Sequence, residues 1–384
     1  MNLQAVTELL SQLVAIDSVN PDLVPGGAGE GAVAAFVAEW LANAGLQVDM
    51  HAVAPNRPNV TAIARGTGGG RSLMLNAHMD TVGVTGMENP FTARVEDGRL
   101  YGRGAYDMKG SLAACMLTMA AVRDMNLAGD VILTAVIDEE YASIGTQAIT
   151  RQYGVDAKHI DAAIITEPTG MQLCVAHKGF VWLEIETEGR AAHGSRPDLG
   201  VDAITKMGRI LVGLERLGDQ LQAGVPHPLL GTGSLHASLI TGGQELSSYP
   251  ERCTLKIERR TIPGESPALV EAQVREVVDQ AAALDASFCA SVRTLMHQPY
   301  FEIAPDAPIA STVRDQAAAV IGRTPEIVGA TFWMDSALLD AAGIPTVIFG
   351  PGGAGAHAVV EWVDLEQVVQ CAQIYTNVAR AFCG

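Results

Sequence analysis

Short apolar runs rich in β-forming residues alternate with helical stretches, and this alternation limits what the chain can fold into. The apolar runs lie at 60–64, 73–77, 131–137 and 162–166. Helical stretches separate several of them, notably around 109–125 and 143–153. Strands and helices that alternate in this way are typical of an α/β fold, so we predict a largely parallel sheet flanked by helices.

The pattern changes near residue 180. An alternating, half-exposed strand at 181–188 is followed by a helix, two alternating strands, a helix at 266–284 and a closing strand near 288–294. The α/β pattern then resumes from residue 308. We therefore expect a main domain formed by 1–178 and 295–384, with a smaller α+β domain inserted at 179–294.

Composition excludes several classes of partner. The 384 residues carry a formal net charge of −18, which argues against nucleic acid or an anionic membrane surface as a partner. No run of about 18 apolar residues is present, and the N-terminus has no basic segment followed by an apolar stretch. The six cysteines are scattered and form no C-x-x-C pair, as expected of buried thiols in a reducing compartment. These features predict a cytoplasmic, soluble protein.

Potential metal ligands follow four of the predicted strands. Carboxylates and imidazoles stand directly after these strands, or one short loop later: His78 with Asp80, Asp138 with Glu139 and Glu140, Glu167, and His357. The carboxyl ends of the strands in an open α/β sheet face one crevice, so we expect these side chains to converge. Each buried, uncompensated carboxylate costs several kcal/mol, and divalent cations are the natural compensation. Mixed imidazole and carboxylate ligands suit Zn²⁺, with Mn²⁺ or Co²⁺ as substitutes.

Each of these signals has a more ordinary explanation when it is taken alone. A histidine after a strand is more often a satisfied polar residue than a ligand, and a Glu-Glu pair is usually a solvated turn. Four strand ends with the same chemistry favour the metal interpretation. Asp80 stands two residues after His78, and such residues point the same way in an extended chain. We therefore expect Asp80 to accept the second imidazole N–H of His78, although a simple turn aspartate is the alternative.

Several motifs, in order along nearly the whole chain, resemble a single family. They are AHMDTV (77–82), LYGRGAYDMKGSLAA (100–114), DEE (138–140), TEPT (166–169), GRAAHGSRPDLGVDAI (189–204), RRTIPGE (259–265) and GIPTVIFGPGG (343–353) followed by AH (356–357). The chain resembles the family of acetylornithine deacetylase, succinyl-diaminopimelate desuccinylase, carboxypeptidase G and aminoacylase, which are dinuclear zinc amidohydrolases and metallopeptidases. The resemblance implies a zinc-exopeptidase-like catalytic domain and an inserted lid and dimerisation domain.

The resemblance also implies a role for each ligand. It assigns two Zn²⁺ ions per chain, with Co²⁺ or Mn²⁺ possible, to five residues: His78 and Glu167 at one ion, Glu140 and His357 at the other, and Asp107 as the bridge. It makes Glu139 the general acid and base. Adjacent residues of an extended chain point apart, which supports separate roles for Glu139 and Glu140.

Two residues of the predicted inserted domain are candidates for substrate contacts. His193 alone reads as an ordinary turn histidine, but the resemblance implies that it donates to the tetrahedral oxyanion, often from the partner subunit. Arg260 ends an alternating strand and faces away from the core, where a solvated charge is the alternative. The resemblance favours Arg260 over Arg259 as a clamp for a substrate α-carboxylate, which a guanidinium binds bidentately.

These features predict a metal-dependent hydrolase that cleaves the amide bond of a small N-acylated amino acid, as acetylornithine deacetylase does, and that forms a homodimer. A dipeptidase or carboxypeptidase of the same family, acting on short peptides, is one alternative. A relative that binds metal or an amino acid without catalysis is another. The substrate stays open because the AVVE run at 358–361 and the pair Ala105-Tyr106 depart from the family pattern.

Overall fold

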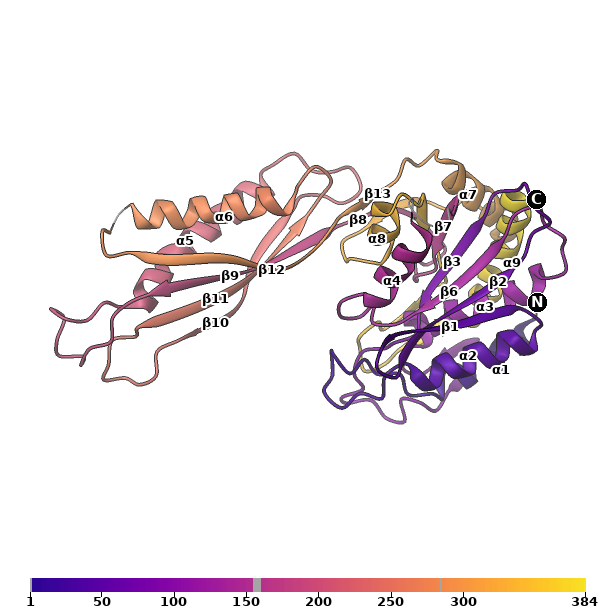
Figure 1. Cartoon of the computed structure of the whole chain (residues 1–384), viewed down its shortest axis with the longest axis horizontal. Coiled ribbons are helices and arrows are strands. Elements are labelled where there is room, and N and C mark those ends of the chain that lie inside the picture. Colours follow the sequence, from indigo (N-terminus) through magenta and orange to yellow (C-terminus); the bar gives the residue numbers. More distant parts are fainter. Residues whose placement is uncertain (1, 155–159, 284) are drawn as a thin grey trace. The chain divides into compact units, whose positions relative to one another are not determined.

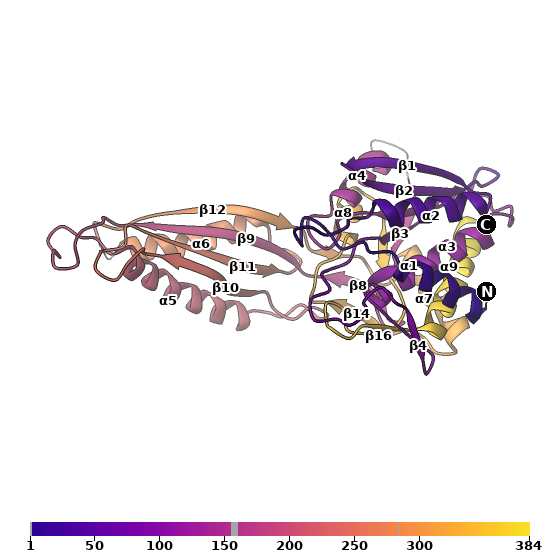
Figure 2. The ribbon, with the colours of Figure 1, turned by 90° about the horizontal axis from the view of Figure 1, so that it is seen from below.

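The computed structural model describes residues 2–154, 160–283 and 285–384, which form two compact units. Unit 1 comprises Met1–Val175, Ile303–Val328 and Met334–Gly384, and unit 2 comprises Ala176–Glu302 and Gly329–Trp333. Figures 1 and 2 show the elements of both units in two views.

The sheet of unit 1 has a parallel centre and antiparallel edges. Its strands run in the order β1 (Gln47–Ala54), β2 (Arg57–Ala64), β6 (Val131–Val136), β3 (Leu73–His78), β7 (Ala162–Ile165), β15 (Thr346–Ile348) and β8 (Leu173–His177). The four strands β6, β3, β7 and β15 pair in parallel and are buried throughout. On either side, β2 and β8 pair antiparallel with this centre, and β1 pairs antiparallel with β2. The predicted fold class is confirmed, and the antiparallel edges are an addition to it.

The helices of unit 1 cover this sheet. Helix α3 (Gly110–Val122) packs against α9 (Leu365–Cys383), α1 (Leu3–Val14) and β3, and it is apolar on all sides, as a helix between other layers must be. Helix α2 (Gly31–Asn43) packs on β2, and α7 (Pro308–Ile321) packs on α9. Helix α4 (Ile144–Tyr153) contacts β6 and the short α8 (Ser336–Ala341).

A second, small sheet in unit 1 joins distant parts of the sequence. Its antiparallel strands run in the order β16 (Gly353–Ala354), β17 (Trp362–Asp364), β5 (Arg99–Tyr101) and β4 (Arg94–Glu96). The pairing of β17 with β5 places the turn that follows β5 beside the loop between β16 and β17. Both segments carry predicted metal ligands, Asp107 and His357.

Unit 2 is an α+β domain. Its sheet runs in the order β10 (Ser234–Gly242), β11 (Arg252–Thr261), β9 (Gly179–Glu188) and β12 (Cys289–Gln298), with antiparallel pairing throughout. Helices α5 (Ala203–Gln222) and α6 (Pro267–Ala282) pack against one face, and the alternating apolar residues of β9 and β11 form the core beneath them. Residue 284, the predicted last residue of the second helix, lies outside the described residues.

The unit boundaries differ from the predicted ones by a few residues. The predicted boundary between 294 and 295 falls inside β12, which continues to Gln298. The chain returns to unit 1 only after β13 (Phe301–Glu302), which pairs with Ala176 and His177. The chain enters unit 2 again within strand β14 (Ile327–Ala330), whose residues 329 and 330 belong to that unit. No sequence pattern indicates this second crossing.

The structure bears on two predictions from composition, the burial of the cysteines and the lack of a membrane-spanning segment. Cys289 is exposed at the start of β12, so the prediction that all six thiols are buried is wrong for this residue, whereas the other five are buried. Within the described residues, no helix is both long and apolar enough to cross a membrane. The cytoplasmic location stays a prediction from the sequence.

Candidate metal centre

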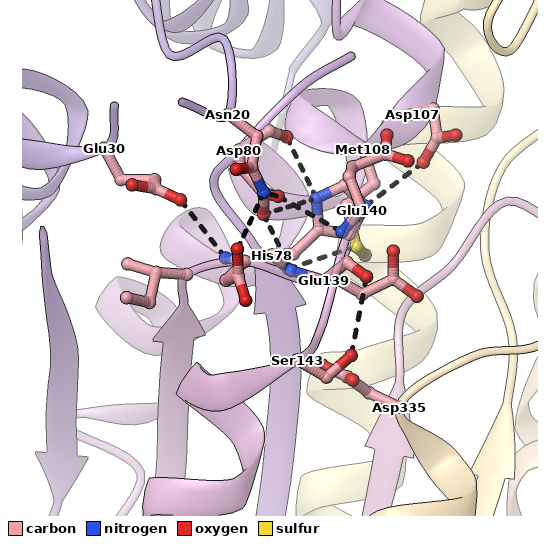
Figure 3. Close-up of polar contacts among 12 residues, drawn as sticks. Asn20, Glu30, His78, Asp80, Asp107, Met108, Glu139, Glu140, Ser143 and Asp335 are labelled. Carbon is pink, nitrogen blue, oxygen red and sulfur yellow. Dashed lines mark hydrogen bonds and ion pairs between the residues drawn. The ribbon is translucent and has the colours of Figure 1, made fainter. Parts of the chain in front are cut away.

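The predicted ligands of unit 1 lie together beyond the carboxyl ends of its parallel strands, and Figure 3 labels three of them, His78, Asp107 and Glu140. His78 is the last residue of β3, Glu140 follows β6 by four residues, and Glu167 follows β7 by two. The chain reaches His357 from β15 through a glycine-rich loop and β16. Parallel strands end at one edge of the sheet, which explains why residues as far apart as His78 and His357 belong to one cluster.

Asp107 lies between the two histidines. Its Oδ1 is 3.2 Å from Nε2 of His78, and its Oδ2 is 3.5 Å from Nε2 of His357. Each carboxylate oxygen therefore faces a different imidazole. A carboxylate that bridges two cations needs this arrangement.

The other two carboxylates each accompany one histidine. Glu140 Oε2 is 3.0 Å from Nε2 of His357, and Glu167 Oε1 is 3.4 Å from Nε2 of His78. The five side chains thus form two sets that share Asp107. One set contains His78 and Glu167, and the other contains His357 and Glu140.

Glu139 lies close to the first set. One ligand atom from each of His78, Glu139 and Glu167 lies within 4.8 Å of the other two, and the same holds for His78, Asp107 and Glu140. Glu139 is therefore near enough to the first set to take a proton from a water held there, and near enough to approach a cation itself.

The electrostatics of the cluster favour a compensating positive charge. Burial, and then the charge of Glu167, raises the pKa of Glu139 well above its usual value. Burial also raises the pKa of Glu167, and together with the charge of Asp107 it raises that of Glu140 to about 7. Glu140 Oε1 is buried and has no hydrogen-bond partner. Imidazoles and carboxylates, one with an unused buried oxygen, are a donor set that fits divalent cations such as Zn²⁺.

Nδ1 of His78 faces Asp80, and its nearer acceptor is the main-chain carbonyl oxygen of Asp80, not the carboxylate. Nδ1 is 3.0 Å from the main-chain carbonyl oxygen of Asp80 and 3.5 Å from Oδ1. Either acceptor fixes the proton on Nδ1 and leaves Nε2 free to bind a cation. The carboxylate of Asp80 instead accepts hydrogen bonds from the main-chain N–H groups of Glu139 (3.2 Å) and Glu140 (3.1 Å). Asp80 therefore holds the loop on which the predicted base stands.

A buried polar network behind Asp80 was not predicted from the sequence. Asn20 Nδ2 donates to Asp80 Oδ2 (2.8 Å) and to Asp138 Oδ1 (3.0 Å), and Arg57 donates to Asp138 at 2.9 Å. Arg57 also donates to Glu30 at 2.6 and 2.7 Å. Partners between 27 and 118 residues apart leave no local pattern, so Asn20, Glu30 and Arg57 look like ordinary turn and surface polar groups in the sequence. Asp138, which the sequence analysis counted among the potential ligands, instead pairs with Arg57 and Asn20.

His193 belongs to unit 2, whereas the predicted ligands belong to unit 1. It is exposed, and its Nδ1 accepts a hydrogen bond from the main-chain N–H of Ser195 at 3.2 Å. An accepting Nδ1 puts the proton of a neutral imidazole on Nε2. A proton on Nε2 is the arrangement that the predicted oxyanion role requires.

The two arginines at the end of β11 face opposite ways. Arg259 lies on the buried face with Ile257 and pairs with Glu265. Arg260 lies on the other face with its side chain 30% exposed, as the alternation predicts. Its Nε donates to Glu258 at 2.6 Å, so a substrate carboxylate would have to compete with Glu258 for this guanidinium.

Comparison with known proteins identifies the family. Residues 74–381 match peptidase family M20/M25/M40, and the chain belongs to this family. It is 30% identical to acetylornithine deacetylase of Myxococcus xanthus over all of this chain and 98% of that protein. It is 28% identical to N-formyl-4-amino-5-aminomethyl-2-methylpyrimidine deformylase of Bacillus subtilis, over 92% of this chain and 89% of that one.

Solved structures confirm the fold. Aminopeptidase PepT from Bacillus cereus has a TM-score of 0.80 at 19% identity, with both chains covered completely. A protein of Bacillus subtilis described as a dinuclear metal-binding peptidase of the M20 family has a TM-score of 0.77 at 17% identity, over 99% of this chain and 98% of that one. The large, mostly parallel sheet and the additional antiparallel sheet are therefore those of M20 peptidase structures.

Proposed function

We propose that the protein is a dinuclear metal hydrolase that cleaves the acyl amide bond of an N-acylated amino acid. The observation that carries this proposal is the position of Asp107, whose two carboxylate oxygens face the two histidines of separate ligand sets. Family membership and the similarity to a deacetylase over the whole chain support it. Two Zn²⁺ ions, or Co²⁺ or Mn²⁺, would be held by His78 and Glu167, by Glu140 and His357, and by Asp107 between them.

The chain's own residues supply the proton transfers. Bound divalent cations would lower the pKa of a water and polarise the substrate carbonyl. Glu139 takes the proton of the attacking water and passes it to the leaving nitrogen, a role for which a pKa raised by burial suits it. Asp80 holds the main chain of Glu139 in place. His193 donates its Nε2–H to the oxygen that becomes negatively charged.

One panel of substrates identifies the preferred acyl group and distinguishes a deacylase from a peptidase. The relatives include a deacetylase and a deformylase, so N-acetyl, N-formyl and N-succinyl amino acids are compared with dipeptides, each with Zn²⁺, Mn²⁺ or Co²⁺. We expect cleavage of at least one N-acyl amino acid, with kcat/KM above that of every dipeptide. Faster cleavage of dipeptides would favour a dipeptidase or carboxypeptidase. Metal binding without turnover of any amide would favour a non-catalytic relative.

We also propose that the protein forms a homodimer through unit 2, in which His193 of one chain serves the metal centre of the other. Strand β10 is an outer strand of its sheet and exposes the apolar side chains of Leu239 (64%) and Ile240 (52%). An outer strand with exposed apolar side chains tends to pair with another chain. A two-fold axis would place the same strand of both chains together.

A further inference from the structure

Glu361 joins the two segments of unit 1 that carry Asp107 and His357. Its carboxylate is buried and accepts four hydrogen bonds from the turn before Asp107. Oε1 accepts from the main-chain N–H groups of Tyr106 (2.9 Å) and Asp107 (3.1 Å). Oε2 accepts from the N–H of Gly104 (3.0 Å) and from Nη1 of Arg103 (2.6 Å). One carboxylate near the C-terminus therefore fixes the main chain of a ligand more than 250 residues earlier.

Arg103 closes the network from the other side. Its Nη2 donates to the carbonyl oxygen of Ala358 at 3.0 Å, one residue after His357. The N–H of Gly102 also donates to the carbonyl oxygen of Glu361 at 3.2 Å. The turn at 102–107 and the loop at 357–361 are thus held to each other by Arg103 and Glu361, both of which are buried.

The two ligand sets depend on this network to different degrees. His78 ends a buried strand and is 1% exposed, and Glu167 follows another buried strand. His357 stands in a loop, with its side chain 59% exposed and a φ of 61°. A residue other than glycine keeps such a backbone conformation only where its surroundings hold it. The position of His357 therefore depends on contacts outside regular strands, whereas that of His78 does not.

We propose that Arg103 and Glu361 are positioning residues that set the affinity for the second cation, the one assigned to Asp107, Glu140 and His357. They contact no ligand atom, and they act by holding the main chain of Asp107 and the loop of His357. This inference rests on the proposed function because it assumes two cations. The affinity of the set that contains His78 and Glu167 depends much less on this pair.

The test measures the two binding constants for Zn²⁺ separately, by competition with a chromophoric chelator, in the wild type and in Glu361→Gln. Removing a group that orients a ligand typically lowers metal affinity by about 10–100-fold. We expect a loss of that size in the constant that His357→Ala removes, and a smaller loss in the other, because the set of His78 and Glu167 shares only Asp107 with this network. Asp130→Asn is the matched control, because Asp130 also accepts from an arginine (Arg65, 2.7 Å) and a main-chain N–H (Gly66, 2.8 Å). Asp130 precedes β6, so it lies at the end of that strand opposite to the metal ligands.

A second variant separates positioning from general loss of stability. Glu361→Gln leaves the guanidinium of Arg103 buried without its carboxylate, which by itself destabilises the fold. The double variant Arg103→Met with Glu361→Gln removes the buried charge, so its Tm should recover relative to Glu361→Gln, while the Zn²⁺ constant of the His357 set stays low. Recovery of that constant together with Tm would overturn the inference, as would an equal loss in both constants, no loss in either, or a wild type that binds a single cation. A wild type that binds two cations but cleaves no amide would contradict the proposed function and leave this inference standing.

Discussion

Glu139 and Glu140 are neighbours in one loop, yet the structure gives their carboxylates different surroundings. Glu140 lies 3.0 Å from His357 through one oxygen, while Glu139 lies within reach of His78 and Glu167. The main chain of both is held by Asp80. The different surroundings support the separate roles proposed for the two residues.

The variant Glu139→Gln tests the role of the predicted base. The amide keeps the size of the side chain but cannot take a proton, so kcat should fall by at least about 10²-fold while the metal content stays at the wild-type value. Activity and elemental analysis of the same preparation check both parts. Retained turnover would move the base to another residue, and loss of metal would show that Glu139 is itself a ligand.

Arg57 should contribute strongly to the folding stability of unit 1. It pairs with Glu30 and Asp138, both buried, so Arg57→Met leaves carboxylates without their cation and should destabilise the fold by about 3–5 kcal/mol. The matched control is Arg65→Met, which breaks a largely exposed pair with Asp130 and should cost about 1 kcal/mol or less. Chemical denaturation measures both. Equal losses would show that the network around Arg57 contributes no more than a surface ion pair.

At the scale of elements, β11 presents one face to the core of unit 2 and the other to solvent, and Arg260 stands on the solvent side. If Arg260 clamps a substrate α-carboxylate, Arg260→Gln should raise KM for N-acyl amino acids and remove the preference for the acid over its C-terminal amide. Lys256→Gln, an exposed cation on the same face, is the control and should leave that preference unchanged. An enzyme that cleaves acid and amide equally well before any substitution would rule out the clamp.

The elements themselves were largely predictable where the sequence is locally consistent. The buried strands β3, β6, β7 and β15 are short apolar runs, and the ligands His78, Glu140 and Glu167 stand at the end of three of them or within four residues of it. Strand β1 was not predicted, because it is mostly exposed and lacks an apolar run. It is formed by pairing with β2, which is a tertiary effect.

The bridging ligand Asp107 and the residues that support the ligands were not predictable from local sequence patterns. Asp107 stands in η1 (Ala105–Lys109), a single π-helical turn after β5, and only the family resemblance indicates it. Asn20, Arg57 and Glu361 act through partners that are distant in the sequence, 254–258 residues away for Glu361. No periodicity or spacing encodes such contacts, so only the folded structure reveals them.

At the scale of the whole molecule, the proposed homodimer makes a quantitative prediction. Glu139→Ala and His193→Ala are both expected to be inactive, and they are unfolded and refolded together. Roughly half of the dimers are then mixed, and each mixed dimer has one intact site if His193 acts on the other chain, so about a quarter of wild-type activity should return. Mixed dimers that form but stay inactive would mean that His193 acts within its own chain or has no role in the reaction.

The central claim, a dinuclear centre built from unit 1, is tested most directly by counting metal ions. Dialysed protein is reconstituted with Zn²⁺, freed of loosely bound ions and analysed for metal per chain, alongside His357→Ala, which removes a ligand of the second set only. We expect about two ions for the wild type, because two ligand sets share a bridging carboxylate, and about one for His357→Ala. A wild type that never exceeds one ion, or a His357→Ala variant that still holds two, would contradict the claim.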